Sequence, residues 1–183
     1  MIAVVILFLH FSLLTSPVQA DEACIKNIKV VNTWDHCILS CNVIGCFTEE
    51  MKKAIDNGID TTFTFYIQLY EIRDLWWDKQ IADLNVSHHI KYDNLKKVYT
   101  VTLSEKDNKV FYVEDFDKAK DLMSGIRGFG ITRLHNFQKG KRYQVRMMAE
   151  LDKITLPFYL DYVFFFLSLW DFETDWYTVD FSY

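Results

Sequence analysis

The sequence predicts an α+β fold that is predominantly antiparallel β, with about eight strands in a sandwich-like or strongly curled sheet and two short helices inserted. Three observations favour this fold class. Segments with apolar residues at every second position recur along the chain, two short stretches have helical spacing with capping residues, and no internal repeat or low-complexity linker divides the sequence. With 183 residues, half of them hydrophobic and 16% aromatic, the chain can bury one core and is not disordered.

The N-terminus has the features of a secretory signal peptide. Residues 2–9 are an unbroken apolar run, Pro17 ends its helix, and small residues up to Ala20 suit cleavage. The segment is too short to span a bilayer comfortably. Because no Lys or Arg precedes the run, an uncleaved anchor or a misassigned start codon is the alternative to a signal peptide over residues 1–20. We expect export to the periplasm or cell envelope, with a single β-rich domain over residues 21–183.

The first two strands are expected to form a hairpin that carries the cysteines. Residues 25–33 and 37–44 resemble strands, and the three residues between them suit a short loop. Antiparallel pairing across that loop places Cys24 opposite Cys46. An even number of cysteines in an exported protein favours disulfides, so we predict a disulfide between Cys24 and Cys46.

The other two cysteines, Cys37 and Cys41, share one strand face and are expected to be small buried side chains. At ~3.3 Å per residue they lie about 13 Å apart, too far to bond each other. Zinc binding through His36 and the last three cysteines is the competing interpretation, but this spacing fits no common zinc site. We therefore predict no metal.

A capped helix and a long strand come next. Thr48 can cap a helix over residues 48–58, which has acids in its first turn and Gly58 at its end. Residues 59–73 then alternate, with phenylalanines on one face and threonines on the other. A strand of this length is unusual, so we expect a bend or bulge near residues 74–78.

The middle of the chain continues the same pattern. Residues 80–92 and 95–103 alternate and are predicted to be strands. Residues 115–128 are predicted to form the second helix, capped by an aspartate and ended by a glycine. Two further strands, residues 131–137 and 142–151, are expected to pair as a hairpin.

The C-terminal segment is rich in aromatic residues. Residues 176–183 alternate strictly, which predicts a strand with one buried face. The closing strands of outer-membrane barrels have a similar pattern, but two capped helices have no place in a simple barrel wall. Residues 154–170 contain Pro157 and Asp161 and only a short apolar run. We expect a short buried helix or turn segment there, with a membrane-surface patch as the alternative.

Seven short motifs carry a family resemblance by their order and spacing. In chain order they are Ala54-Ile-Asp-Asn-Gly58, Arg73-Asp-Leu-Trp-Trp-Asp78, Tyr92-Asp-Asn-Leu95, Val98-Tyr99, Leu151-Asp152, Leu156-Pro157 and Ser168-Leu-Trp170. Together they resemble an uncharacterised family of exported bacterial proteins, domain of unknown function 4390 (DUF4390). The resemblance covers nearly all of residues 21–183. It implies an envelope location and brings no established activity or catalytic residue.

The sequence contains no recognisable catalytic or cofactor motif. The glycines at Gly128 and Gly130 lack the third glycine of a phosphate-binding loop, and neither a metalloprotease helix nor a nucleophile elbow is present. His88 and His89 are adjacent on a predicted strand, so they point to opposite faces and cannot share a ligand. The net charge of −5 and the absence of a basic run argue against a nucleic-acid partner. We expect no cofactor and no enzymatic activity; a site of scattered carboxylates with Arg73 is the alternative.

The best binding candidates are Arg73, Trp76 and Trp77, together with Trp170 and Asp171. Neighbouring side chains on a strand alternate, so one tryptophan of the adjacent pair could be exposed to a partner. A bulge, or burial on both sheet faces, would instead place both inside, and this is the expectation that we favour. We predict a non-enzymatic module that binds an envelope protein through a sheet edge or through this bend. A carrier of lipid-like ligands or a membrane-surface binder is the alternative.

Overall fold

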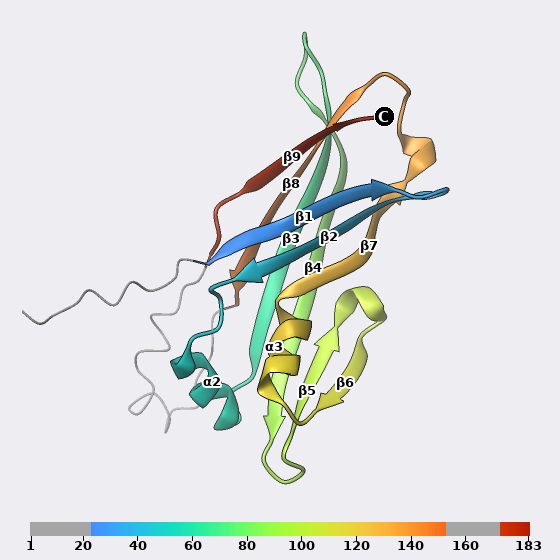
Figure 1. Ribbon diagram of the computed structural model, residues 1–183. Coiled ribbons are helices and arrows are strands. Elements are labelled where there is room, and N and C mark those ends of the chain that lie inside the picture. Colours follow the sequence, from blue (N-terminus) through green and yellow to red (C-terminus); the bar gives the residue numbers. More distant parts are fainter. Residues whose placement is uncertain (1–22, 153–172) are drawn as a thin grey trace, which may run out of the picture.

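The computed structural model describes residues 23–152 and 173–183. These residues form two antiparallel sheets and two α-helices, which confirms the predicted fold class (Figure 1). Neither sheet closes on itself. The signal peptide predicted for residues 1–20 and the helix or turn segment predicted for residues 154–170 lie outside the described residues.

The larger sheet has six strands in the order β6-β5-β4-β3-β8-β9, and every neighbouring pair is antiparallel. Its strands are, in chain order, β3 (Thr61–Ile72), β4 (Lys79–Asp93), β5 (Val98–Leu103), β6 (Lys109–Val113), β8 (Arg142–Leu151) and β9 (Tyr177–Ser182). The sequence patterns identified all of these except β6, which is short and lies at one edge. The aromatic C-terminal strand is confirmed as β9 at the other edge.

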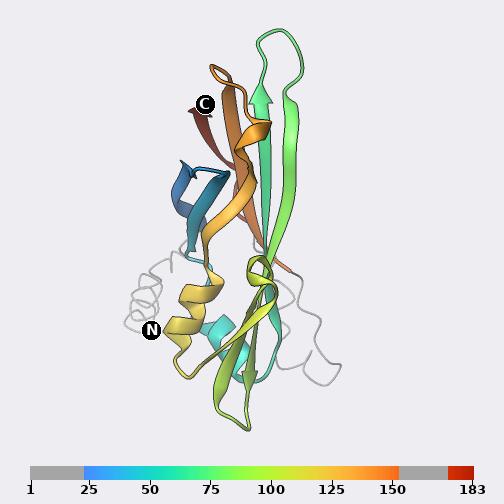
Figure 2. The same ribbon diagram turned by 90° about the vertical axis from the view of Figure 1, so that its right-hand side faces the viewer.

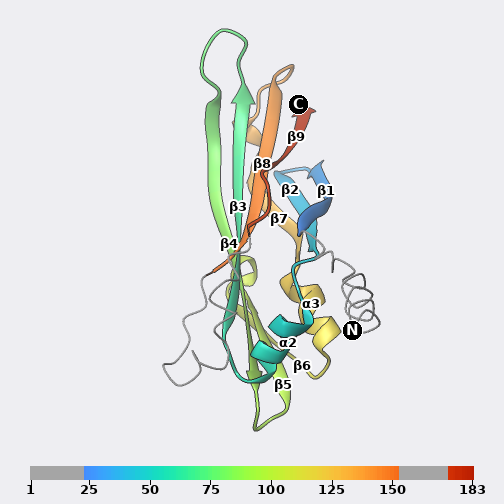
Figure 3. The same cartoon turned by 90° about the vertical axis from the view of Figure 1, so that its left-hand side faces the viewer.

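The smaller sheet has three strands in the order β1-β2-β7, namely β1 (Cys24–Asn32), β2 (His36–Ile44) and β7 (Gly125–Arg133). This sheet packs on one face of the larger sheet, and the helices α2 (Glu49–Asp56) and α3 (Phe116–Met123) cover the remainder of the same face (Figures 2 and 3). The molecule is therefore a two-layer sandwich in which part of one layer is helical.

The core lies between these layers. On β3, Phe63, Phe65, Ile67 and Leu69 are all at most 1% exposed, and Leu39 of β2 is fully buried in the same core cluster. The inward face that the alternation predicted for β3 is thus confirmed. Burial of large apolar side chains on this scale is the main source of stability for a sandwich.

Both helices begin at their predicted caps. The Thr48 hydroxyl accepts a hydrogen bond from the backbone N–H of Met51 at 3.2 Å. The Asp115 carboxylate accepts one from the backbone N–H of Lys118 at 3.0 Å. Each cap satisfies a donor that the first helical turn leaves unpaired, so two helices of only eight residues are fixed at their N-termini.

The predicted end of the second helix at Gly128 is wrong. Helix α3 ends at Met123, and strand pairing with β2 begins immediately afterwards at Gly125. A Cβ atom at Gly125 would lie 2.6 Å from the side-chain oxygen of Asn42, so glycine allows β7 to approach β2 at this point. Ile126 is buried as expected, but it belongs to strand β7 and not to the predicted helix.

The predicted hairpin between residues 131–137 and 142–151 is also wrong. The first of these segments belongs to β7 and the following turn, and β7 pairs with β2 in the smaller sheet. The second is β8, which pairs with β3 and β9 in the larger sheet. A short 3-10 helix, η3 (Leu134–Asn136), connects the two strands. The chain therefore crosses from one layer to the other where the sequence suggested a simple reversal.

The predicted Cys24–Cys46 disulfide is absent, because the register of the first hairpin differs by two residues from the expected one. The β1–β2 turn pairs Asn32 with Cys37, one residue earlier than expected, and a bulge within β1 shifts the ladder by another residue. Cys24 consequently lies opposite Ile44, and all four cysteines are free thiols. The expectation that Cys37 and Cys41 are small buried side chains is confirmed, because both are at most 2% exposed.

Candidate functional site

The candidate site is the connection between β3 and β4. These strands pair from Thr61 opposite Ile90 as far as Glu71 opposite Lys79, so residues 73–78 reverse the chain completely. The bend expected in this region is therefore the end of a long hairpin. We call residues 73–78 the hairpin tip. It forms one extremity of the molecule, and the β4–β5 turn lies at the other (Figure 1).

The hairpin tip carries three consecutive exposed apolar side chains. Leu75 is 91% exposed, Trp76 77% and Trp77 90%. The expectation that both tryptophans are inside is wrong, because these residues follow the last paired position of the ladder and have no sheet face to alternate between. Nowhere else among the residues that the structure describes are two large apolar side chains in succession this exposed. Trp34 and Leu95, at 93% and 96%, stand alone in their turns.

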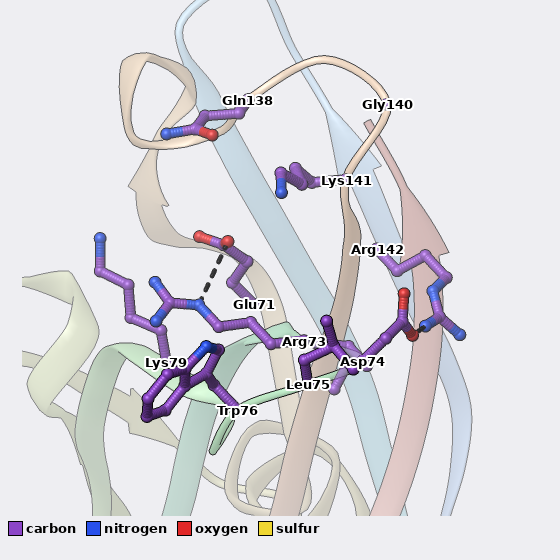
Figure 4. A pocket seen from close by; sticks show the side chains of 11 residues that line it. Glu71, Arg73, Asp74, Leu75, Trp76, Lys79, Gln138, Gly140, Lys141 and Arg142 are labelled. Carbon is purple, nitrogen blue, oxygen red and sulfur yellow. Dashed lines mark hydrogen bonds and ion pairs between the residues drawn. The ribbon is translucent and has the colours of Figure 1, made fainter.

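Beside the hairpin tip is an open hollow of about 590 Å³, formed where β3, β4 and the start of β8 meet (Figure 4). We call it the basic hollow, because four cations and two carboxylates are among its lining residues, whereas the whole chain has a net charge of −5. The charged side chains that line it are Glu71, Arg73, Asp74, Lys79, Lys141 and Arg142. Leu75 and Trp76 complete its apolar wall.

Both carboxylates of the basic hollow are engaged by arginines. The Glu71 side chain is nearly buried, and its Oε1 lies 3.5 Å from Nε of Arg73 (Figure 4). Asp74 forms an ion pair and hydrogen bond with Arg142 of β8. No carboxylate in the described part of the chain pairs with the ammonium group of Lys79 or Lys141. The basic hollow therefore has two cations available for a negatively charged group.

A set of polar contacts holds the base of the hairpin tip. The Asp78 carboxylate accepts a hydrogen bond from the backbone N–H of Arg73 at 3.2 Å, which closes the loop. The same carboxylate lies 3.4 Å from the guanidinium of Arg146 on β8. That guanidinium stacks over the ring of Tyr70, 4.4 Å from its centroid. The exposed tryptophans are thus carried on a braced loop.

The structure brings together three of the predicted binding residues, Arg73, Trp76 and Trp77, and the first two line the basic hollow. Trp170 and Asp171 lie outside the described residues. Among the contributors that sequence analysis did not single out are Leu75, Lys79, Lys141 and Arg142. The alternation on both sides of residues 73–78 was the available signal for Leu75 and Lys79, because it indicates a reversal. The two β8 residues required the β3–β8 pairing, which no local pattern reveals.

A second cluster of titratable groups is buried under the opposite half of the larger sheet. His88 on β4 is fully buried; its Nδ1 lies 2.9 Å from the carbonyl oxygen of Met123, and its Nε2 lies 3.1 Å from a carboxylate oxygen of Glu105. Burial raises the pKa of Glu105, but the hydrogen bond and charge of His88 outweigh this and hold the pKa below its usual value. Because a carbonyl can only accept, Nδ1 carries a proton.

This pair links three elements. It joins β4, the C-terminus of α3 and the 3-10 helix η2 (Ser104–Lys106), with both side chains at most 2% exposed. A substrate cannot reach either group, so the pair is structural. The opposite directions of His88 and His89 are confirmed, because the His89 side chain is 40% exposed.

The buried thiols have no reactive character. Burial raises the pKa of Cys37 and of Cys41 to about 11 and that of Cys46 to about 12, so these groups are protonated at neutral pH. Within residues 23–152 and 173–183, no three His, Cys, Asp or Glu side chains are grouped so as to hold a metal ion. Over the same ranges, no helix has the length and apolar character needed to cross a membrane.

The fold and the site together define a two-layer antiparallel β domain with an exposed aromatic hairpin. The chain belongs to the DUF4390 family, because the family model described as "Domain of unknown function (DUF4390)" matches residues 20–180. This confirms the resemblance drawn from the sequence motifs. Among curated proteins and among solved structures, none matches this chain.

Proposed function

We propose that this protein is an exported, non-enzymatic binding module of the cell envelope, and that it contacts its partner through the hairpin tip. The observation that carries the proposal is the run of Leu75, Trp76 and Trp77, each at least 77% exposed at one extremity of the molecule. Large apolar side chains that are exposed to water raise the free energy of the unbound protein. Their burial against a partner surface lowers it and therefore favours binding.

The setting of the hairpin tip supports a role in recognition. Tryptophan combines a large apolar surface with a polar N–H, and it is enriched where proteins contact other surfaces. The long β3–β4 ladder and the contacts of Asp78 and Arg146 hold the tip in place before binding. A preformed contact loses less conformational entropy on binding than a flexible one.

The chemistry of the described residues supports a non-enzymatic role. The carboxylates beside the hairpin tip are engaged by arginines, and His88 and Glu105 are enclosed with each other. The basic hollow is lined mostly by charged and polar groups, which does not suit the acyl chain of a carried lipid. Export is supported by the apolar segment of residues 2–9. The protonated, buried thiols are slow to oxidise and therefore suit an oxidising compartment.

Site-directed photocrosslinking in intact cells tests this proposal. The photoreactive residue benzoylphenylalanine is placed at position 77 of the full-length chain or, as the matched control, at position 95. Both positions are at least 90% exposed, but position 95 lies in the β4–β5 turn at the other extremity. We expect an adduct from position 77, with either a partner protein or a lipid and identified by mass spectrometry, and none from position 95. No adduct from position 77, or the same adducts from both positions, would contradict the proposal.

A further inference from the structure

We propose that the partner of the hairpin tip is the surface of an anionic lipid bilayer, into whose interfacial region Trp76 and Trp77 insert. This inference rests on the proposed function and names the partner for the same residues. Three features of the structure carry it: the chemistry of the exposed side chains, the shape of the tip, and the charge around it.

The exposed side chains are of the kind that bilayer interfaces accept. Indole rings concentrate at the level of the lipid headgroups, where the apolar ring is removed from water and the N–H keeps a polar partner. Leu75 adds an apolar side chain, next to the two tryptophans, that can reach the acyl boundary. None of the three rests on the body of the protein, since they are between 77% and 91% exposed.

The shape of the tip suits a lipid surface better than a protein surface. A stable protein interface buries about 800 Å² on each partner, which normally takes twenty or more residues. The apolar surface here comes from three residues at the end of one hairpin. A narrow apolar projection of this kind inserts into a fluid surface without a complementary pocket.

The charge around the tip selects an anionic surface. Lys79 and Lys141 are exposed, line the basic hollow together with Trp76, and have no carboxylate partner among the described residues. The basic hollow also holds more cations than carboxylates. This local excess stands out on a chain whose net charge is −5. Basic side chains next to inserted apolar groups are attracted to anionic lipid headgroups, and the two effects add. The basic hollow is open and can accept a phosphate group of such a lipid.

Vesicle binding tests the inference directly. The chain is purified in the processed form that the cell produces. It is then sedimented with vesicles of phosphatidylcholine alone, or of phosphatidylcholine with about 30% phosphatidylglycerol, which makes the vesicle surface anionic. We expect binding to the anionic vesicles. The double variant Trp76→Ser/Trp77→Ser should bind them at least about tenfold more weakly.

The charge is tested separately. The variant Lys79→Gln/Lys141→Gln should bind anionic vesicles about 25-fold more weakly, since each basic side chain near the surface contributes about fivefold. Its weak binding to neutral vesicles should be unchanged. The control Leu95→Ser removes a leucine that is 96% exposed at the opposite extremity, and this variant should bind anionic vesicles like the wild type. Thermal unfolding followed by circular dichroism establishes that each variant is folded.

Three results would overturn the inference. They are wild-type binding that the tryptophan variant retains, equal binding to neutral and anionic vesicles, and no vesicle binding at all. A protein adduct from position 77 in cells, combined with no vesicle binding, rejects the lipid partner and leaves the proposed function standing. Absence of both rejects the two proposals together.

Discussion

The tip and the paired strands of the β3–β4 ribbon place apolar and charged side chains in opposite ways. At the hairpin tip, Leu75, Trp76 and Trp77 are in solvent, and Asp74 is paired with Arg142 at the surface. Within the paired strands, Phe65 is buried, and the titratable pair of His88 and Glu105 is enclosed beside it. The paired strands have the arrangement of a stable core, whereas the tip has the arrangement of a contact surface.

This difference teaches that stability and binding are separable in this protein. Core side chains contribute to folding through burial, and the exposed tip contributes almost nothing to it. Substitutions in the two regions should therefore affect different measurements.

The largest effect on stability is expected in the core. Phe65→Ala removes a ring that is 1% exposed and lies 5.0 Å from the His88 ring, centroid to centroid. The free energy of unfolding should fall by about 3–5 kcal/mol. Trp77→Ala removes an even larger side chain from the tip and should change it by no more than about 0.5 kcal/mol. Urea unfolding measures both, and similar losses for the two variants would refute the separation.

The His88–Glu105 pair predicts a loss of stability in acid. Because the pKa of Glu105 is lower in the folded state than its ordinary value of 4.5, the unfolded chain takes up the proton first as the pH falls. The contribution of this group is complete above pH 4.5 and declines below it, by at most about 1.4 kcal/mol per pH unit. It is lost once the pH passes the folded-state pKa.

The matched variant for this prediction is Glu105→Gln, which cannot titrate. Urea unfolding is measured between about pH 3 and about pH 7, a range that includes ordinary carboxylate pKa values. As the pH falls, the free energy of unfolding should decrease less steeply for the variant than for the wild type. Identical slopes would show that this pair does not contribute to the acid response.

A smaller effect is expected at the N-terminus of α2. Thr48→Ala removes the hydroxyl that accepts from Met51 and should lower the free energy of unfolding by about 1 kcal/mol. Thr48→Ser keeps an acceptor at the same place and should restore most of this loss. If serine and alanine have the same effect in urea unfolding, the cap is not the source of the stability.

The smallest effect on stability is expected from Asp74→Asn. Asp74 is paired with Arg142 at the surface, and exposed ion pairs contribute at most about 1 kcal/mol and usually less. The substitution removes one of the two carboxylates of the basic hollow, so it should strengthen binding to anionic vesicles while urea unfolding changes by about 0.5 kcal/mol or less. Weaker vesicle binding would contradict the role given to the charge.

Much of the fold could be predicted from the sequence because its signals are local. Period-two alternation identified β3 and β9, and Thr48 and Asp115 are capping residues that identify helix starts without tertiary information. Pairing between strands is not local. The alternation in β7 predicts a strand, but no feature of this segment indicates that its partner is β2. The β1 bulge that separates Cys24 from Cys46 is equally invisible in the sequence.

The site was predicted in part for the same reason. Residues 73–78 contain no glycine or proline, and their turn-favouring residues are the two aspartates alone, so the sequence indicates a bend more clearly than a complete reversal. The tryptophans were therefore expected inside a sheet, although their value for binding was recognised. The contribution of Lys141 and Arg142 depends on β8 lying beside β3, which only the structure provides.

The most direct test of the central claim measures whether the hairpin tip is covered in the cell. Leu75→Cys and Leu95→Cys, which keep both tryptophans, are labelled with a small water-soluble maleimide in the purified protein and in intact cells. The wild type is the blank, since three of its four thiols are buried. Both introduced thiols should react equally fast in the purified protein. In cells, position 75 should react at least about tenfold more slowly than position 95, because a partner covers it. Equal reaction at the two positions in cells would contradict the account.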